Sequence, residues 1–322
     1  MLHRPHQMMK PRFSALFLCT LMIASVFAGC LGGEDDVDGC MDATANNYNA
    51  DATVDDMSCT YDPTMTSVME SYAADTMAYD DAWSSLQSIR ACAETGSNNP
   101  CEIVEMTIGD ASTFDPHDAY DSASGDVIEN VFDTLYRYEG DGSGNAIIVP
   151  RLATGHTISD DQLTYTFTLR DDVYFSNGDH MTAEDVVYSW ERVNEMASPL
   201  SHVSWITEQN FNTSGLTMID DTHFSVTLMQ PYAGFISTIA YTVGAIVNKD
   251  LCEANRIVTA DDPATADVDE SSDDWCHGWM DEAPLGAGTG AYIVDSWTRE
   301  TSIVLTPNWM YWEDGGFNIN RF

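Results

Sequence analysis

Lysine is nearly absent from this 322-residue chain, and cations of any kind are few. Lys10 and Lys249 are the only lysines, and 12 lysines and arginines stand against 52 aspartates and glutamates, a net charge of −40. Such a chain repels phosphate backbones, so a nucleic-acid-binding protein is excluded. A surface dense in carboxylates keeps a protein hydrated and monomeric at high ionic strength, where salt screens the repulsion between the charges. We therefore predict a monomer from a marine or halophilic source.

Catalytic and metal-binding signatures are also missing. The sequence contains no GxSxG elbow, no HExxH and no phosphate-binding loop, and no two histidines stand four residues apart. The cysteines form no CxxC pair, which argues against a zinc site. We therefore expect a protein that is not an enzyme and that carries no cofactor or metal.

An apolar stretch near the N-terminus indicates export. Residues 13–28 are almost uniformly apolar and follow several basic residues. About 16 residues fall short of the roughly 20 that span a membrane, so residues 1–29 are predicted to be a signal peptide. The junction ending at Cys30 resembles the lipobox of secreted lipoproteins, which implies a lipid on Cys30 and an anchor at the outer face of the cytoplasmic membrane. The alternatives are an uncleaved anchor helix or cleavage without lipid.

Six cysteines remain after the signal peptide and Cys30, and they stand in local couples. The couples are Cys40 with Cys59, Cys92 with Cys101, and Cys252 with Cys276. Six cysteines allow 15 connectivities, of which these neighbouring pairs are the simplest. An oxidising compartment outside the cell permits them, so we predict three disulfides.

Residues 30–65 are rich in Asp, Asn and small residues and poor in apolar ones. This composition predicts a lipid-anchored, acidic, disulfide-stapled tether rather than a core. Between Cys40 and Cys59 it resembles a short acidic module of secreted marine proteins. Its oxygens are of the kind that calcium binds, although EF-hand spacing is absent. A calcium-stabilised surface interaction lipoprotein without a transport role is therefore the alternative function.

Residues 66–101 are interpreted as a helix and a clamp. Acidic and apolar residues interleave at near-helical spacing from 66 to 92 without Pro or Gly, which predicts one amphipathic helix. A turn follows at 98–100, and a disulfide between Cys92 and Cys101 would clamp it to a strand at 103–108.

From residue 102 onward the pattern predicts a mixed α/β fold. Ser122 or Ser124 can cap a helix whose apolar face runs through 127–135. Strict alternation predicts a half-buried strand at 163–169, and a second one follows at 224–228.

Two further segments stand out in this region. Residues 182–185 form a capping box, with Thr at the N-cap and an acid three residues later, and open a helix that runs to Val193. Residues 250–283 are acidic and contain Cys252 and Cys276, so we interpret them as a disulfide-stapled surface insertion.

Several motifs occur along residues 102–322 in an order that resembles one protein family. They are TFDP at 113–116, VPRLA at 149–153, SDD at 159–161, TYTFTLRD at 164–171, VYFSNG at 173–178, MTAEDVV at 181–187, PYAGF at 231–235, LGAGTGAY at 285–292 and NWMYW at 308–312. The series is similar to that of the family 5 extracellular solute-binding proteins, the peptide- and nickel-binding receptors of ABC importers. Ala291 departs from it, because the family usually has proline there.

The resemblance implies a fold and a function. The expected fold is the two-lobed, periplasmic-binding-protein type II-like fold, with the first lobe present in residues 102–322 and the second lobe largely missing. The expected function is that of a lipoprotein that captures oligopeptides or dipeptides outside the membrane for an ABC permease. The family residues that bind the ligand's termini lie mostly in the missing part.

The candidate ligand contacts are residues that the motifs place at a cleft. They are Ser112 and Thr113, exposed by the turn at Asp115–Pro116, Tyr136 at the end of the first helix, Tyr232, and Gly288, Thr289 and Gly290 at the lobe junction. Peptides suit such a site because main-chain groups can bind their backbones. Each candidate has a structural alternative, such as a core tyrosine at Tyr136 or a strand or hinge device at Gly290.

Overall fold

In a computed structural model of the chain, the described residues are 37–41, 45–60, 63–91, 101–107, 109–196, 200–259, 272–282 and 285–313. The chain divides into two compact units, residues 1–62 and residues 63–322. Cys30 and Cys92 lie outside the described residues, so the lipidation of Cys30 stays a prediction. Within the described ranges, no helix has the length and apolar character needed to cross a membrane.

The first unit is closed by a disulfide. Strand β1 (Asp38–Gly39) pairs in parallel with β2 (Val54–Asp55). The predicted bond between Cys40 and Cys59 is confirmed, with the two Cα atoms 4.7 Å apart. Among the residues described, no group of three or more His, Cys, Asp or Glu side chains is placed to hold a metal ion.

The second unit begins with two helices where the sequence predicts one. Helix α1 (Met65–Ala73) starts at a capping box formed by Thr64 and Ser67, and α2 spans Tyr79–Arg90. Between them Asp75 takes a left-handed backbone conformation with φ of 54°. The prediction of a single helix is wrong because this turn uses aspartate, which tolerates the left-handed region, in place of glycine or proline.

The segment after Cys101 does not form the predicted strand. Residues 103–107 belong to no strand of the described chain, and Val104 and Met106 are 80% and 93% exposed. A strand requires a hydrogen-bonded partner, so the prediction for 103–108 is wrong over its described part. Cys101 is disulfide-bonded, and Cys92, the partner predicted for it, lies outside the described residues.

A four-stranded antiparallel sheet carries one hydrophobic core. In spatial order its strands are β5 (Ala153–Ile158), β6 (Thr164–Leu169), β8 (His223–Thr227) and β7 (Leu216–Asp220). The strands predicted at 163–169 and 224–228 are confirmed as β6 and β8. Phe167 of β6 and Phe224 of β8 stack with their ring centres 5.0 Å apart, and the Trp190 ring meets both rings edge-on. Such aromatic contacts add to the free energy gained from burying the rings.

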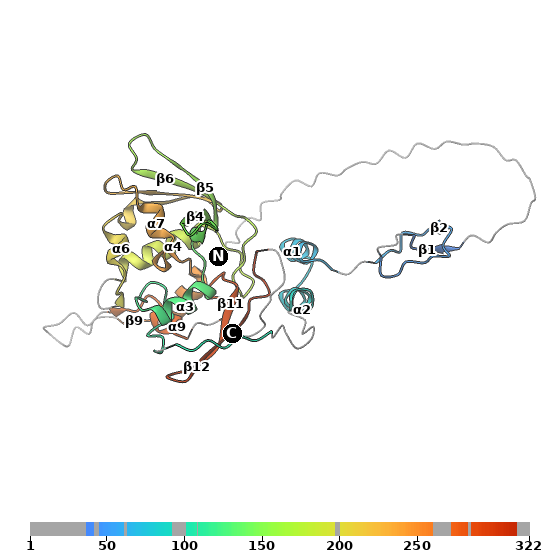
Figure 1. The fold of residues 1–322 in the computed structure, drawn as a ribbon. Coiled ribbons are helices and arrows are strands. Elements are labelled where there is room, and N and C mark those ends of the chain that lie inside the picture. The colour runs from blue at the N-terminus through green and yellow to red at the C-terminus, as the bar shows by residue number, and fades with distance from the viewer. Residues whose placement is uncertain are drawn as a thin grey trace, which may run out of the picture. The chain divides into compact units, whose positions relative to one another are not determined.

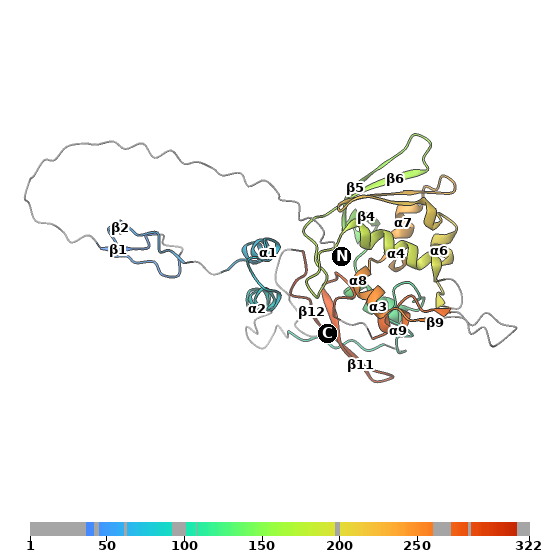
Figure 2. The ribbon, with the colours of Figure 1, turned by 180° about the vertical axis from the view of Figure 1, so that it is seen from behind.

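Trp190 belongs to helix α4 (Ala183–Glu195), which begins where the sequence predicts. The Thr182 side chain accepts the Glu184 amide, and the Asp185 carboxylate accepts the Thr182 amide at 2.9 Å, which confirms the capping box. Figure 1 shows β5 and β6 on one side of α4 and α3 and α9 on the other, and Figure 2 shows the same order from behind.

Helix α3 (Ser122–Val131) confirms the predicted helix with a different start and end. The N-cap is Asp121, whose carboxylate accepts the Ser124 amide at 2.9 Å. Aspartate caps a helix as well as serine does, and it stands one position before the expected start. The apolar spacing continues to Leu135, but the backbone becomes extended at Phe132.

Two antiparallel hairpins and several short elements complete the unit. The hairpins are β3 (Tyr136–Gly140) with β4 (Ala146–Pro150) and β11 (Tyr292–Thr298) with β12 (Ser302–Pro307). The short elements are α6 (Trp205–Glu208), η1 (Thr213–Gly215), α7 (Phe235–Ile239), η2 (Thr242–Gly244), α8 (Lys249–Asn255), β9 (Val258–Thr259), β10 (Ser272–Asp273) and α9 (His277–Met280). Tyr136, expected at the end of a helix, is the first residue of β3.

Candidate functional site

A turn at residues 112–118, here called the Thr113 turn, carries two of the predicted ligand contacts at a pocket of about 380 Å³. The pocket is lined by Ser112, Thr113, Asp118, Tyr120, Asp121, His202, His277 and Asp281. Its carboxylates make it an acidic hollow that suits a ligand with a cationic group. The sequence prediction included Ser112 and Thr113 and missed the other six.

The two predicted residues differ in exposure. Ser112 is exposed, and its hydroxyl donates to Asp121 at 2.5 Å. Thr113 is only 4% exposed, which contradicts the expectation that the turn would present it to solvent. The reason is Asp281, whose carboxylate covers the threonine and accepts a hydrogen bond from its hydroxyl group. The hydroxyl oxygen of Thr113 also accepts a hydrogen bond from the Asp115 amide at 3.0 Å.

A fully buried ion pair lies behind the turn. Arg192, in the last turn of α4, donates to both carboxylate oxygens of Asp115, at 2.8 and 2.5 Å, and both side chains are 0% exposed. Arg192 Nε also donates to the Trp275 carbonyl at 2.7 Å. Burial alone would raise the pKa of Asp115, but the Arg192 guanidinium outweighs it and holds this pKa well below its usual range.

Two histidines complete this cluster, and their pKa values are shifted in opposite directions. Arg192 donates a hydrogen bond to His117 Nδ1 at 2.8 Å, so the ring proton of His117 is on Nε2. Nε2 donates in turn to the Ala245 carbonyl at 3.1 Å. Burial, followed by the Arg192 charge, lowers the pKa of His117 to about 3, so His117 is neutral. His277 Nδ1 donates to Asp115 at 2.9 Å, and this hydrogen bond raises the pKa of His277 against the effect of burial.

The two histidines predict opposite pH dependences of stability. The pKa of His117 falls from 6.5 to about 3 on folding, so its stabilising contribution is complete above pH 6.5 and lost as the pH falls toward 3. The slope is at most about 1.4 kcal/mol per pH unit. The pKa of His277 is raised, so its contribution is complete below pH 6.5 and lost as the pH rises through the folded value. The contribution of the pair to the free energy of unfolding should therefore be greatest near pH 6.5.

Urea unfolding between pH 4.5 and 8.5 measures this dependence, with His277→Gln as the matched variant. Subtracting the variant's pH profile from that of the original chain isolates His277 from the other titrating groups. The difference should shrink above pH 6.5 and stay level below it. A difference that grows with pH would contradict the assignment.

The predicted residues at the lobe junction are buried against the end of α3. The Gly290 amide donates to the Val131 carbonyl at 2.9 Å. A Cβ on Gly288 would lie 2.2 Å from that same oxygen, and one on Gly290 would lie 2.5 Å from the Asn130 oxygen, so both positions require glycine. The Thr289 hydroxyl donates inward to Asp133 at 3.1 Å. These contacts give the three residues packing roles in the described chain, and ligand contact by them stays a prediction.

Asp133 connects this junction to the NWMYW segment. It also accepts from Arg151 Nε at 2.8 Å and from the Trp312 indole at 3.0 Å. Arg151 in turn reaches Glu313 at 3.0 Å. The polar network therefore ties Thr289, which lies just before β11, and the residues after β12 to one buried carboxylate.

Helix α2 holds the same segment from another direction. Arg90, buried at the end of α2, donates to the carbonyls of Trp309 at 3.0 Å, Tyr311 at 2.6 Å and Glu313 at 2.8 Å. The helix pair α1–α2 is thus built into the second unit. Nothing in the local sequence pattern identifies Arg90 as buried, because its acceptors are main-chain groups more than 200 residues away.

Tyr136 and Tyr232 do not line the pocket at the Thr113 turn: Tyr136 belongs to the first hydrophobic core, on the four-stranded sheet, and Tyr232 contacts Tyr165 of that core. Tyr136 is buried, and burial raises its pKa to about 12, so it keeps its proton and donates to His156 Nδ1 at 2.7 Å. Tyr232 is 42% exposed and accepts through its carbonyl from Tyr165 at 3.5 Å. The structure thus divides the predicted residues among the turn, the junction and the first core, and ligand contact by Tyr136 and Tyr232 stays a prediction.

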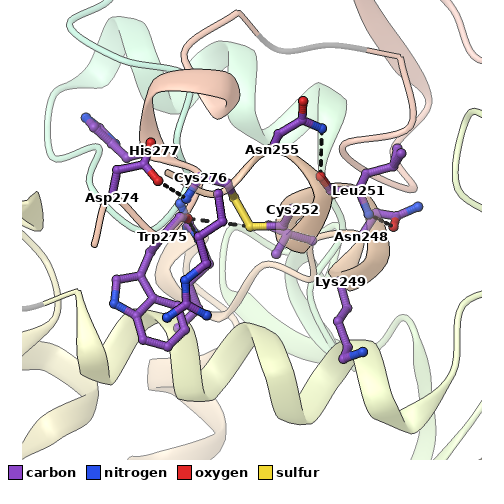
Figure 3. The surroundings of a disulfide bond; sticks show 12 residues. Asn248, Lys249, Leu251, Cys252, Asn255, Asp274, Trp275, Cys276 and His277 are labelled. Carbon is purple, nitrogen blue, oxygen red and sulfur yellow. Dashed lines mark hydrogen bonds between the residues drawn. A yellow bond between two sulfur atoms is a disulfide. The ribbon is translucent and has the colours of Figure 1, made fainter. Parts of the chain in front are cut away.

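The predicted disulfide between Cys252 and Cys276 is confirmed and lies next to the pocket. The Cα atoms are 5.3 Å apart, and both cysteines are buried in a second hydrophobic core, which includes Phe114, Ile128 and Leu305. Figure 3 shows the bond joining α8 to the segment that carries Trp275 and His277. The described part of the segment interpreted as a surface insertion is anchored in the core by Cys276 and Met280, which are buried, whereas Ile257 and Val258 are 64% and 66% exposed.

Comparison with known proteins gives the family of this chain. The profile of the bacterial extracellular solute-binding proteins, family 5 Middle, matches residues 148–322. Among curated proteins, the chain is 38% identical to the dipeptide-binding protein of Lactococcus lactis over 133 residues, which are 38% of this chain and 24% of that protein. It is 26% identical to the glutathione-binding protein GsiB of Escherichia coli, over 66% of this chain and 36% of GsiB. The chain thus spans about a third or less of the length of these relatives.

Solved structures share the fold. The substrate-binding domain of an oligopeptide ABC transporter from Bacillus anthracis matches with a TM-score of 0.52 and 21% identity, over 66% of this chain and 39% of that structure. DppA of Helicobacter pylori in complex with the peptide STSA matches with a TM-score of 0.51 and 24% identity, over 66% and 40%. The first is a substrate-binding domain and the second a periplasmic binding protein associated with an ABC transporter, and this chain has their mixed α/β architecture over part of a lobe. With more than half of its residues matched by the family profile, the chain belongs to the family 5 bacterial extracellular solute-binding proteins and carries part of their fold.

Proposed function

We propose that the protein carrying this sequence is the substrate-binding lipoprotein of an ABC importer and that it captures dipeptides or oligopeptides. The family supplies the role of solute binding outside the cytoplasm. Relatives named for dipeptide and glutathione binding support a peptide ligand. The permease partner and the lipid anchor at Cys30 belong to the same proposal.

The acidic pocket at the Thr113 turn is the observation that carries the proposal to this chain. An exposed Ser112 hydroxyl and the carboxylates of Asp118 and Asp121 meet there. A peptide presents an ammonium group and a row of main-chain donors and acceptors, which such a surface can bind. Removing the Ser112 hydroxyl should therefore weaken binding, since one hydrogen bond contributes about 0.5–1.5 kcal/mol.

Titration calorimetry on the complete natural protein tests this function. Dipeptides, tripeptides and longer peptides are titrated, and at least one class should bind with Kd in the micromolar range or below. Ser112→Ala should raise that Kd by about 2- to 12-fold, the equivalent of one hydrogen bond. Ser214→Ala is the matched control, because Ser214 is exposed on η1 and bonds only locally, to Asn212. No heat with any peptide would exclude the peptide assignment.

No observation in the described part of the chain favours the calcium-stabilised alternative over the receptor. The unit of residues 37–60 is closed by its disulfide and a short parallel pair. The alternative therefore stays a sequence prediction.

A further inference from the structure

Residues 272–282, here called the strap, contact the Thr113 turn at successive points. The Trp275 carbonyl accepts from Arg192 at 2.7 Å, and His277 donates to Asp115 at 2.9 Å. Farther along, Asp281 accepts the Thr113 hydroxyl proton and the Phe114 amide, the latter at 3.3 Å. The strap thus contacts residues 113–115 of the turn directly, and it also binds Arg192, the buried partner of Asp115.

The strap contains a strained turn, in which the carboxylates of Asp273 and Asp274 accept hydrogen bonds from the amides of Trp275 and Cys276, both at 3.0 Å. Trp275 and Cys276 have φ of 48° and 59°, two consecutive non-glycine residues in the left-handed region. Each such residue costs free energy and persists only where its surroundings fix it. Besides these local hydrogen bonds, the disulfide to Cys252 ties Cys276 to α8 (Figure 3). The Arg256 guanidinium lies 3.5 Å from the centre of the Trp275 ring and holds that side chain from the other side of the disulfide loop.

Two strap side chains also form part of the pocket wall. His277 and Asp281 line the pocket together with Ser112 and Thr113. The position of this wall therefore depends on the backbone that the disulfide holds. An altered strap would move a carboxylate of the pocket and free the Thr113 hydroxyl at the same time.

We propose that the strap, locked by the Cys252–Cys276 disulfide, positions the ligand pocket, with Asp281 as a positioning residue that acts through Thr113. The proposal rests on the proposed function for the identity of the ligand. The geometry of the turn depends on the strap whether or not a peptide binds. Loss of the lock should therefore loosen the Thr113 turn and lower ligand affinity together.

A double substitution tests the lock against a matched control. Cys252→Ala with Cys276→Ala removes it, and Cys40→Ala with Cys59→Ala removes the disulfide of the first unit. Amide hydrogen exchange of residues 112–118 and peptide Kd by calorimetry are measured on the complete natural protein and on both variants. The first variant should exchange at least tenfold faster at the turn and bind at least tenfold more weakly, and the control should match the natural protein in both.

The two measurements separate the two proposals. Unchanged exchange at the turn in the Cys252→Ala, Cys276→Ala variant would overturn the positioning role, even if peptides bind. If the natural protein binds no peptide, the proposed function fails, and faster exchange at the turn alone would still support the strap.

A conservative pair of variants tests Asp281 without removing the disulfide. Asp281→Asn keeps an oxygen that can accept the Thr113 hydroxyl proton, whereas Asp281→Ala does not. Exchange at the turn should stay within about twofold for the asparagine variant and rise at least fivefold for the alanine variant. Equal exchange in the two would show that Asp281 does not act through Thr113.

Discussion

Replacing Arg192 with leucine is expected to lower the free energy of unfolding by about 3–5 kcal/mol, because the fully buried carboxylate of Asp115 would lose its guanidinium partner and, of its side-chain donors, keep only His277. Both side chains are 0% exposed and meet through two hydrogen bonds. The leucine also leaves the Trp275 carbonyl and His117 Nδ1 without the donor they have now. Urea unfolding at pH 6.5, fitted to a two-state transition, measures the loss.

Lys249→Met is the control for the loss of a positive charge near the surface. Lys249 lies near Glu184, Asp250 and Glu253, whose carboxylates are well exposed, and such pairs contribute about 0–1 kcal/mol. A loss in Arg192→Leu no larger than in this control would show that Asp115 finds another partner or takes up a proton. The double variant Asp115→Leu, Arg192→Leu should recover part of the loss, since no isolated charge then remains buried.

Arg90→Met should cost about 2–4 kcal/mol and detach the helix pair α1–α2 from the NWMYW segment. Arg90 is buried and donates to three carbonyls of residues 309–313. A methionine fills much of the space but donates nothing, so buried carbonyl oxygens would be left unsatisfied. The free energy of unfolding gives the size of the effect, and limited proteolysis within residues 63–91 reports the detachment.

A second arginine serves as the matched control for Arg90. Arg137 is 39% exposed and pairs with Glu139, so Arg137→Met should change stability by less than about 1 kcal/mol. Tyr72→Phe and Tyr79→Phe each remove one hydrogen bond of the same helix pair and should cost about 1 kcal/mol apiece. Proteolysis of Arg90→Met at the rate of the original chain would contradict the role given to Arg90.

The parts of the fold that were predictable are those written within a few neighbouring residues. The capping box at Thr182 and Asp185 and the alternation along β6 are local patterns, and both appear as predicted. Cys252 and Cys276 are close enough in sequence for the nearest-pair argument to hold. The order of motifs gave the family, which the profile match over 148–322 confirms.

The parts that were missed depend on contacts between distant residues. A sequence pattern gives no reason to bury an arginine on a predicted helix. Arg192 is buried because of its pairing with Asp115, which stands 77 positions earlier in the chain. Asp281 covers Thr113 from 168 positions away, so the sequence placed the threonine in solvent. The break at Asp75 is a local feature, yet it escapes because the turn contains neither glycine nor proline.

The side chains of helix pair α1–α2 donate hydrogen bonds to main-chain carbonyls of the segments they contact, and this affects which residues evolution must keep. Tyr72 and Tyr79 donate to the carbonyls of Gly178 and Ser176, both at 2.6 Å, as Arg90 does to the NWMYW segment. Every amino acid offers that carbonyl, so the contact with Tyr79 places no demand on the side chain of Ser176, which instead accepts the hydrogen bond of the Gly286 amide at 2.7 Å. Gly178 is the exception, because a Cβ there would lie 2.4 Å from the Tyr72 hydroxyl. Selection to keep this joint therefore acts on the side chains of the two tyrosines and the arginine, whereas the accepting residues, Gly178 apart, are constrained only by their own packing and side-chain contacts.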